Sequence, residues 1–176
     1  MAGQKDWDEA ITEYRQAVSL NPDDPQAHRA LGLALPQKRD WVGAIGEYRE
    51  ALHRHSADAE LEQKLGEALY ARGDLTGAVS ALRAAASLEP DDAKVRNMLG
   101  LGLYGLEDMD GAVAACSEAV RLDPKYTEAY NNLGDALLKK GDRRRPLEAY
   151  HRAFELAPNS STLGASYEAI LKQLSP

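Results

Sequence analysis

The sequence has little of what a β-rich protein needs. Val, Ile and Thr together number 13 of 176 residues, against 29 Ala and 24 Leu, and this balance favours helices over strands. A β-sandwich or a β-barrel is therefore excluded. Leu, Ile, Val and Phe are sparse enough that composition alone leaves open whether the chain folds, so the pattern of residues has to decide.

Disulfides and long apolar runs are also missing. Cys116 is the only cysteine, so no intramolecular disulfide can form, and we interpret this residue as a small buried hydrophobe. No stretch approaches the ~18 uncharged apolar residues that span a bilayer, and residues 1–6 lack the apolar core of a signal peptide. We expect the protein to be cytoplasmic and to make no contact with a membrane. Its location is unknown if the sequence is part of a longer chain.

An excess of positive charge is absent. The chain carries 21 Lys and Arg against 28 Asp and Glu, which gives a net charge of −7. An acidic protein is repelled by a phosphate backbone, so we expect nucleic acid to be an unlikely partner.

What the sequence does contain is a period of 34 residues along nearly its whole length. Closing prolines fall in the segments LNP at 20–22, LEP at 88–90, LDP at 122–124 and LAP at 156–158, and Ser56 stands where one more proline is expected. The same step links Gly32, Gly66, Gly100 and Gly134; Leu31, Leu65, Leu99 and Leu133; Ala10, Ala44, Ala78 and Ala112; and Ala17, Ala51, Ala85, Ala119 and Ala153.

Each unit of 34 residues has the pattern of two amphipathic helices. In residues 61–69, Leu and Ala recur at i, i+4, i+7 and i+8, Gly73 and Asp74 interrupt the pattern, and residues 78–86 resume it. Gly66 and Ala78 are small, which predicts that the two helices cross most closely there. Pro90 ends the second helix, and Asp92 is placed to cap the next one.

The order of Leu-Gly, Ala, a bulky residue, Ala and Pro resembles the tetratricopeptide repeat family, and the resemblance covers nearly the whole chain. It implies an all-α fold, a right-handed superhelical solenoid of antiparallel helix pairs, in a single domain over residues 1–176. In this register, residues 1–24 form a half repeat with only the second helix, complete repeats cover 25–58, 59–92, 93–126 and 127–160, and residues 161–176 form a C-terminal capping helix.

Four positions depart from the repeat pattern. Pro36 falls in the last turns of a first helix, so we expect a kink or a shortened helix there, whereas Pro146 lies in a first turn and is tolerated. Ser56 in place of proline leaves its helix end less firmly specified. The helix at 6–20 lacks a preceding helix, so we expect exposed apolar surface on it that favours self-association, through Ile11, Tyr14 and Val18.

Motifs for catalysis are missing. The four histidines form no HExxH motif, and we interpret them as exposed surface residues: His28, His53, His55 and His151. The acidic pairs at 23–24 and 91–92 precede helices, where capping explains them. We therefore predict no enzymatic activity, no cofactor and no metal site.

In the family that the chain resembles, the first helix of each repeat lines a concave groove that binds peptides or helices. The resemblance therefore implies a non-catalytic protein–protein interaction scaffold. Its candidate peptide-binding groove consists of Arg29, Leu33, Gln63, Glu67, Tyr70, Lys94, Asn97, Leu101, Tyr104, Glu128, Asn131 and Asp135.

The two tyrosines of this groove, Tyr70 and Tyr104, occupy equivalent positions one repeat apart, and with Leu33 and Leu101 they form a partly apolar floor. Much of the rim is acidic, through Glu60, Glu67, Glu128 and Asp135. We therefore expect the partner to be a protein or peptide segment with apolar anchors and some basic residues. Relatives that bind the carboxyl-terminal tails of heat-shock chaperones use a clamp of Lys, Asn and Arg that this chain does not match, so we predict that this activity is absent.

Two alternatives remain open. The protein could be a self-assembling structural module that associates through residues 6–20. It could also contact an anion or nucleic acid through the turn at 139–145, where the candidate anion patch consists of Lys139, Lys140, Arg143, Arg144 and Arg145. The simpler interpretation of that run is a solvated turn between helices.

Overall fold

The computed structural model describes residues 2–142 and 144–174, and within them the regular structure is entirely helical. The chain divides into two compact units, residues 1–90 and 91–176. The first unit contains α1 (Ala2–Leu20), α2 (Pro25–Ala34), the 3-10 helix η1 (Leu35–Lys38), α3 (Trp41–Arg54), α4 (Ala59–Ala71) and α5 (Leu75–Leu88). The second contains α6 (Ala93–Gly105), α7 (Met109–Leu122), α8 (Thr127–Lys139), α9 (Arg145–Leu156) and α10 (Ser161–Leu174).

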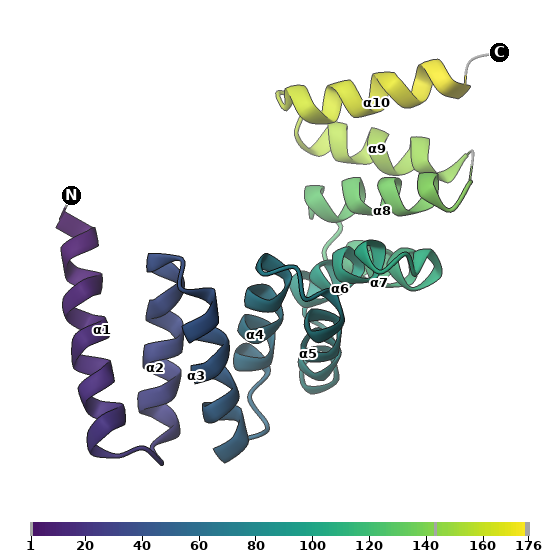
Figure 1. The fold of residues 1–176 in the computed structure, drawn as a ribbon. Coiled ribbons are helices and arrows are strands. Elements are labelled where there is room, and N and C mark those ends of the chain that lie inside the picture. Colours follow the sequence, from purple (N-terminus) through teal and green to yellow (C-terminus); the bar gives the residue numbers. More distant parts are fainter. Residues whose placement is uncertain (1, 143, 175–176) are drawn as a thin grey trace. The chain divides into compact units, whose positions relative to one another are not determined.

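Within each unit, consecutive helices pack side by side as antiparallel pairs (Figure 1). The pairs α2 with α3, α4 with α5, α6 with α7 and α8 with α9 fall in the four stretches predicted to be complete repeats. The expected crossing points are confirmed, because a Cβ atom built at Gly66 would lie 2.6 Å from Leu82 Cγ, and one at Gly134 2.8 Å from Tyr150 Cε1. Glycine is therefore what lets the two helices of a pair approach each other.

An aspartate caps each of the helices α2 to α7, whereas α8 and α9 have no side-chain cap. Asp24 and Asp92 cap α2 and α6, as predicted for Asp92, and each accepts a backbone N–H from the first turn. The second helices α3, α5 and α7 use one further pattern, in which an aspartate accepts the N–H of a glycine three residues later: Asp40 with Gly43, Asp74 with Gly77, and Asp108 with Gly111. These three caps were not predicted, although their spacing repeats at 34 residues.

Pro36 and Pro146 affect their helices as expected, and α3 ends before Ser56 without a closing proline. Pro36 shortens α2, which ends at Ala34 and continues as η1, while Pro146 is buried in the first turn of α9. Without a closing proline, α3 still ends at Arg54, the position equivalent to Leu88 at the end of α5. The end of this helix does not depend on the closing proline.

The expected exposed apolar face of residues 6–20 is corrected by the packing of α1 on α2. Ile11 is buried in the core cluster of the first unit, and Tyr14 and Val18 pack against that cluster and are half-buried. The prediction rested on the missing preceding helix, but the following helix α2 covers this face. What α1 leaves half-exposed is the side that carries Ala10, Tyr14 and Ala17, whereas the equivalent Ala44, Tyr48 and Ala51 of α3 are buried.

The predicted capping helix α10 is only partly buried. Ile170 is buried, and the Tyr167 ring stacks on Phe154 with centroids 5.9 Å apart, so this helix does pack on α9. Leu171 is exposed. Residues 175 and 176 of the predicted segment lie outside the described residues.

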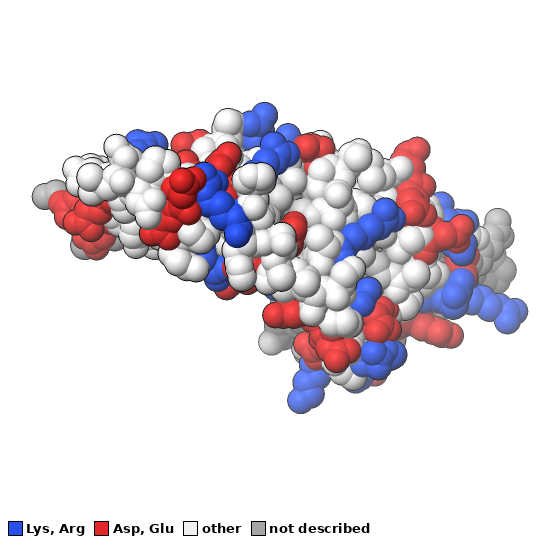
Figure 2. Space-filling view, turned by 90° about the horizontal axis from the view of Figure 1, so that it is seen from below, with Lys and Arg blue, Asp and Glu red and all other residues white. Residues whose placement is uncertain are grey.

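The last structural features concern the lone cysteine, the surface charges and the length of the helices. Cys116 is buried, as predicted, and burial raises the pKa of its thiol to about 12. On the face seen from below, acidic and basic side chains are interspersed with uncharged surface (Figure 2). No helix in the described part of the chain is long and apolar enough to cross a membrane.

Candidate functional site

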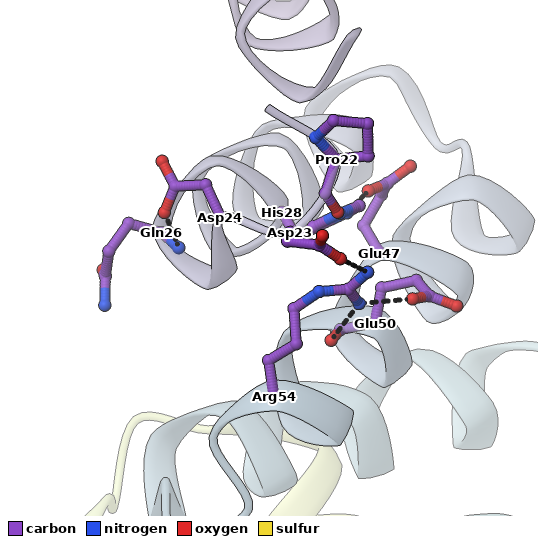
Figure 3. A network of polar contacts seen from close by, with 8 residues as sticks. All are labelled: Pro22, Asp23, Asp24, Gln26, His28, Glu47, Glu50 and Arg54. Carbon is purple, nitrogen blue, oxygen red and sulfur yellow. Dashed lines mark hydrogen bonds and ion pairs between the residues drawn. The ribbon is translucent and has the colours of Figure 1, made fainter. Parts of the chain in front are cut away.

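A polar network ties the turn between α1 and α2 to α3 (Figure 3). His28 Nδ1 lies 2.6 Å from Glu47 Oε2, and His28 Nε2 lies 2.8 Å from the carbonyl oxygen of Pro22. The same turn is held by Arg54, which donates to Asp23 at 2.9 Å and to Glu50 at 2.6 Å. The prediction that His28 is an exposed surface residue was wrong, because its side chain is needed to join these elements and is buried.

The first helices of the repeats in the first unit, α2 and α4, form what we call the first-helix face of that unit. On this face, the side chain of Arg29 is already paired with two carboxylates. Its guanidinium forms ion pairs with Asp58, the residue that caps α4, and with Glu60. The side chain of Arg29 is only 25% exposed. Arg29 therefore links α2 to the start of α4, and a ligand would have to displace two carboxylates to bind it.

In the first unit, the predicted groove residues Leu33 and Tyr70 lie on α2 and α4. Leu33 and Tyr70 are half-buried and pack against the core cluster, so one side of each is supported and the other is open. Beside them, Gln63 Nε2 donates to Glu67 Oε1 at 2.9 Å, and Lys64 Nζ lies 2.9 Å from the other oxygen of Glu67. This gives an apolar surface with a polar edge whose side chains are held in place.

In the second unit, Asn97 was predicted to line the groove, and this prediction was wrong. Asn97 is only 3% exposed, donates from Nδ2 to the Tyr126 hydroxyl at 3.3 Å, and accepts from Asn132 Nδ2 at 2.9 Å. A buried amide needs such partners, so this asparagine joins α6 to α8 and is not open to a ligand. The partners Tyr126 and Asn132 could not be recognised from local sequence, because they lie 29 and 35 residues away.

The apolar surface of the second unit centres on Tyr104. Tyr104 and Leu101 are half-buried on α6, and Leu138 on α8 is 38% exposed. The ammonium of Lys139 lies 4.7 Å from the centre of the Tyr104 ring, within the range of a cation–π contact. Lys139, predicted as part of the anion patch, therefore lies beside a predicted groove residue.

The acidic rim differs from the prediction at Asp135. The Tyr150 hydroxyl donates to its Oδ1 at 2.6 Å, and Asn131 Nδ2 donates to its Oδ2 at 3.2 Å. Burial raises the pKa of Asp135, and the hydrogen bond from Tyr150 acts in the opposite direction. Glu128 is exposed and makes no hydrogen bond or ion pair within the described residues, so it is the rim carboxylate most open to a partner. Lys94 is exposed at the start of α6.

The basic turn is largely paired with acidic side chains. Lys139 Nζ lies 3.3 Å from Glu107, Lys140 Nζ 2.5 Å from Asp110, and Arg145 Nε 2.5 Å from Asp142. Arg144 is exposed, and Arg143 lies outside the described residues. These ion pairs offset the positive charge that binding of an anion would require.

Metal-ligating side chains are dispersed among the described residues. Among them, no three His, Cys, Asp or Glu side chains are grouped so that they could hold a metal ion. The first helices carry half-buried Leu and Tyr side chains together with hydrogen-bonded polar groups.

Comparisons with known proteins identify these helix pairs as repeats of one class, the α-solenoids. Family models described as TPR repeat and tetratricopeptide repeat match residues 3–38, 64–127 and 115–143. The chain belongs to the tetratricopeptide repeat family, and the all-α repeat fold predicted from the 34-residue period is confirmed. No curated protein sequence matches the chain.

Solved structures similar to this one include the protein MamA and the protein YrrB. The MamA crystal structure has a TM-score of 0.85 at 23% identity, over 92% of this chain and 94% of that one. YrrB, described as a TPR protein with an unusual peptide-binding site, has a TM-score of 0.86 at 21% identity, over 96% and 86%. The first TPR of Spaghetti (RPAP3), bound to an HSP90 peptide, has a TM-score of 0.65 at 21% identity, over 67% and 94%.

Proposed function

We propose that this protein is a non-catalytic interaction scaffold that binds a peptide or a helix on the first-helix faces of its repeats. The observation that carries the proposal is the pair of half-exposed apolar surfaces, Leu33 with Tyr70 in the first unit and Leu101 with Tyr104 in the second. Leu and Tyr side chains supported from one side bury apolar area on binding without first having to be ordered.

Two kinds of relative support this proposal. The tetratricopeptide repeat is a family of interaction modules, and two of the similar structures are described as binding peptides. Their identity to this chain is too low to transfer a ligand, so the partner's chemistry is argued from the residues alone. Glu67 and Glu128 lie on these faces of a chain with a net charge of −7, which favours a segment with apolar anchors and some Lys or Arg.

The test compares capture of partners from a lysate of the source organism. The parent chain is compared with the double variant Tyr70→Ala, Tyr104→Ala, after circular dichroism has shown that both are folded. The control is Leu88→Ala, Leu106→Ala, because these two leucines are exposed, at 43% and 41%, and lie off the predicted groove positions.

A partner that the parent and the leucine control capture, and that the tyrosine variant does not, would support binding on the first-helix faces. Equal capture by all three proteins would overturn the proposal. A reduction with the leucine control as large as with the tyrosine variant would also overturn it, because the loss would then reflect exposed apolar area in general.

The half-exposed side of α1 supports a second candidate, self-association. Ala10, Tyr14 and Ala17 occupy the positions at which α3 buries Ala44, Tyr48 and Ala51 against the first helix of its repeat. Such a side can be covered by another helix. Sedimentation over a wide range of protein concentration tests this candidate: association predicts a mass that falls on dilution and a weaker effect in Tyr14→Ser, whereas a monomer at every concentration would contradict it.

A further inference from the structure

A surface pocket of about 400 Å³ lies in the first unit, away from the first-helix faces. Four residues of α3 form one side of it: Val42, Ile45, Gly46 and Arg49. The other side comes from the end of α4 and the turn that follows, with Leu69, Arg72 and Asp74. Its volume falls at the low end of the range of pockets that bind small ligands or single anchoring side chains.

The floor of the pocket is apolar and has room. Ile45 and Leu69 are buried beneath it, and Val42 beside them is 63% exposed. Gly46 has no side chain, and apart from its chain neighbours and the backbone of its own helix no atom lies within 4 Å of where its Cβ would be. An exposed valine next to an open space over a helix leaves an apolar recess that an aliphatic side chain can fill.

The rim of the pocket carries two arginines with no partner. Arg49 and Arg72 are both exposed and form no ion pair or side-chain hydrogen bond within the described residues. Three other cations of the same unit are paired: Arg29 with Asp58, Lys38 with Asp8, and Arg54 with Asp23. Arg15, Arg39 and Arg83 are exposed and unpaired within the described residues like the two rim arginines, but they do not line this pocket. The remaining charged group is Asp74, whose Oδ1 accepts the Gly77 N–H at 2.9 Å as the cap of α5.

We propose that this pocket binds a short acidic peptide segment, with one aliphatic side chain in the recess over Gly46 and flanking carboxylates on Arg49 and Arg72. Guanidinium groups bind carboxylates in a planar geometry with two hydrogen bonds, so two free arginines on either side of an apolar recess select for carboxylates around an aliphatic residue. No aromatic side chain lines the pocket, so it offers no stacking surface for a nucleobase. The pocket is complementary to a ligand opposite in charge to the one proposed for the first-helix faces.

The probe for the test is the synthetic peptide Asp-Glu-Leu-Glu-Asp with blocked ends, titrated into the ¹⁵N-labelled full chain and followed by NMR. The expected result is saturable shifts of the backbone amides of Gly46, Arg49 and Arg72. The same peptide with Ser in place of Leu tests the recess, and the peptide Lys-Lys-Leu-Lys-Lys tests the charge. Both should bind at least about tenfold more weakly.

Two variants test the two parts of the pocket. Gly46→Leu fills the recess, and the open space around Gly46 means that the fold accepts the side chain. Arg49→Ala, Arg72→Ala removes the rim charges, and its matched control, Arg15→Ala, Arg83→Ala, removes the same charge from exposed positions elsewhere in the unit. Gly46→Leu and the rim variant should each weaken binding at least about tenfold, and the control should bind like the parent.

Unchanged affinity in Gly46→Leu, or an equal loss in the rim variant and its control, would overturn the proposal. Shifts confined to the amides of Leu33 and Tyr70 would also overturn it, because they would place the acidic peptide on the first-helix face. The variant Tyr70→Ala, Tyr104→Ala should bind this peptide like the parent, so a failure here and a failure of the proposed scaffold function are separate results.

Discussion

Glycines in this chain have opposite effects on stability according to what surrounds them. A Cβ at Gly100 would run into Cys116 Sγ of the facing helix and lie 3.4 Å from the carbonyl oxygen of Ala112, whereas Gly46 faces open space. Both lie inside helices, where glycine has the lowest helix propensity of any residue except proline. The same substitution should therefore have opposite effects at the two positions.

The first prediction is that Gly100→Leu lowers the free energy of unfolding by more than about 2 kcal/mol, because it forces α6 and α7 apart. Gly46→Leu should leave stability unchanged or raise it by up to about 1 kcal/mol, because it only replaces a poor helix former by a good one. Chemical denaturation followed by circular dichroism measures both. A Gly100→Leu protein as stable as the parent would refute the assignment of Gly100 as a helix crossing.

His28 illustrates a residue whose role depends on its neighbours. Burial lowers the pKa of its imidazole, but the hydrogen bonds to the Pro22 carbonyl and the Glu47 carboxylate outweigh burial and hold the pKa above the ordinary value of 6.5. Because both neighbours are acceptors, both ring nitrogens must donate, and the contacts as they stand require the protonated ring. Arg54 opposes this protonation through its own positive charge.

The second prediction follows from that raised pKa. The stabilisation by His28 should be fully present below pH 6.5, the ordinary pKa, and should be lost as the pH rises through the higher pKa of the folded state. The difference in free energy of unfolding between the parent and His28→Gln should therefore shrink above pH 6.5. Urea titrations at a series of pH values measure it, and curves that stay parallel across this range would contradict the prediction.

At the scale of the helix, ends and starts follow different rules. Starts are local, because one aspartate accepts N–H groups two or three residues later, and the sequence predicted Asp92 in this role. The end of a helix is not set by the closing proline alone, because α3 ends at Arg54 although Ser56 stands where the equivalent helices are followed by proline. The shortening of α2 at Pro36 was predictable, since proline lacks the N–H that the helix needs.

The third prediction concerns the start of α4, where Asp58 has two roles. Its Oδ1 accepts the N–H of Leu61 at 2.9 Å as a helix cap, and its Oδ2 pairs with Arg29. Asp58→Asn should keep the cap and lose only the ion pair, whereas Asp58→Ala loses both. We expect Asp58→Ala to be less stable than Asp58→Asn by about 1 kcal/mol in thermal or urea unfolding, and equal stability of the two variants would show that the cap contributes nothing.

At the scale of the whole chain, each helix packs mainly on its neighbours in sequence, as in repeat proteins generally. Stability in such proteins is close to a sum of local terms. Damage in one unit should therefore remain there.

The fourth prediction tests this locality with Leu82→Ala. Leu82 is buried in α5 of the first unit, and its truncation leaves a cavity that should cost about 2–5 kcal/mol. Hydrogen exchange should become faster in α4 and α5 and stay unchanged in α8 and α9. Equally faster exchange in α9 would show that the chain unfolds as a single cooperative unit.

The candidate site was predictable in outline and not in detail. Leu33, Tyr70, Leu101 and Tyr104 are half-exposed on first helices, as their positions in the repeat indicated. Arg29 and Asn97 were expected at the same surface, but one is held by two carboxylates and the other is buried. Position in the repeat indicates which side of a helix a residue lies on, but whether a polar residue there is already satisfied depends on other repeats.

The amino-acid sequence by itself determined the class of fold, the 34-residue period, the caps and the effect of Pro36, because each arises within a few residues along one helix. Only the tertiary structure decided which side chains remain free. Asn97 with Asn132 and Arg29 with Asp58 are contacts between residues 35 and 29 positions apart, and the pocket at Gly46 exists only because α4 ends beside α3. Such contacts depend on neighbours in space, and no pattern local to one helix specifies them.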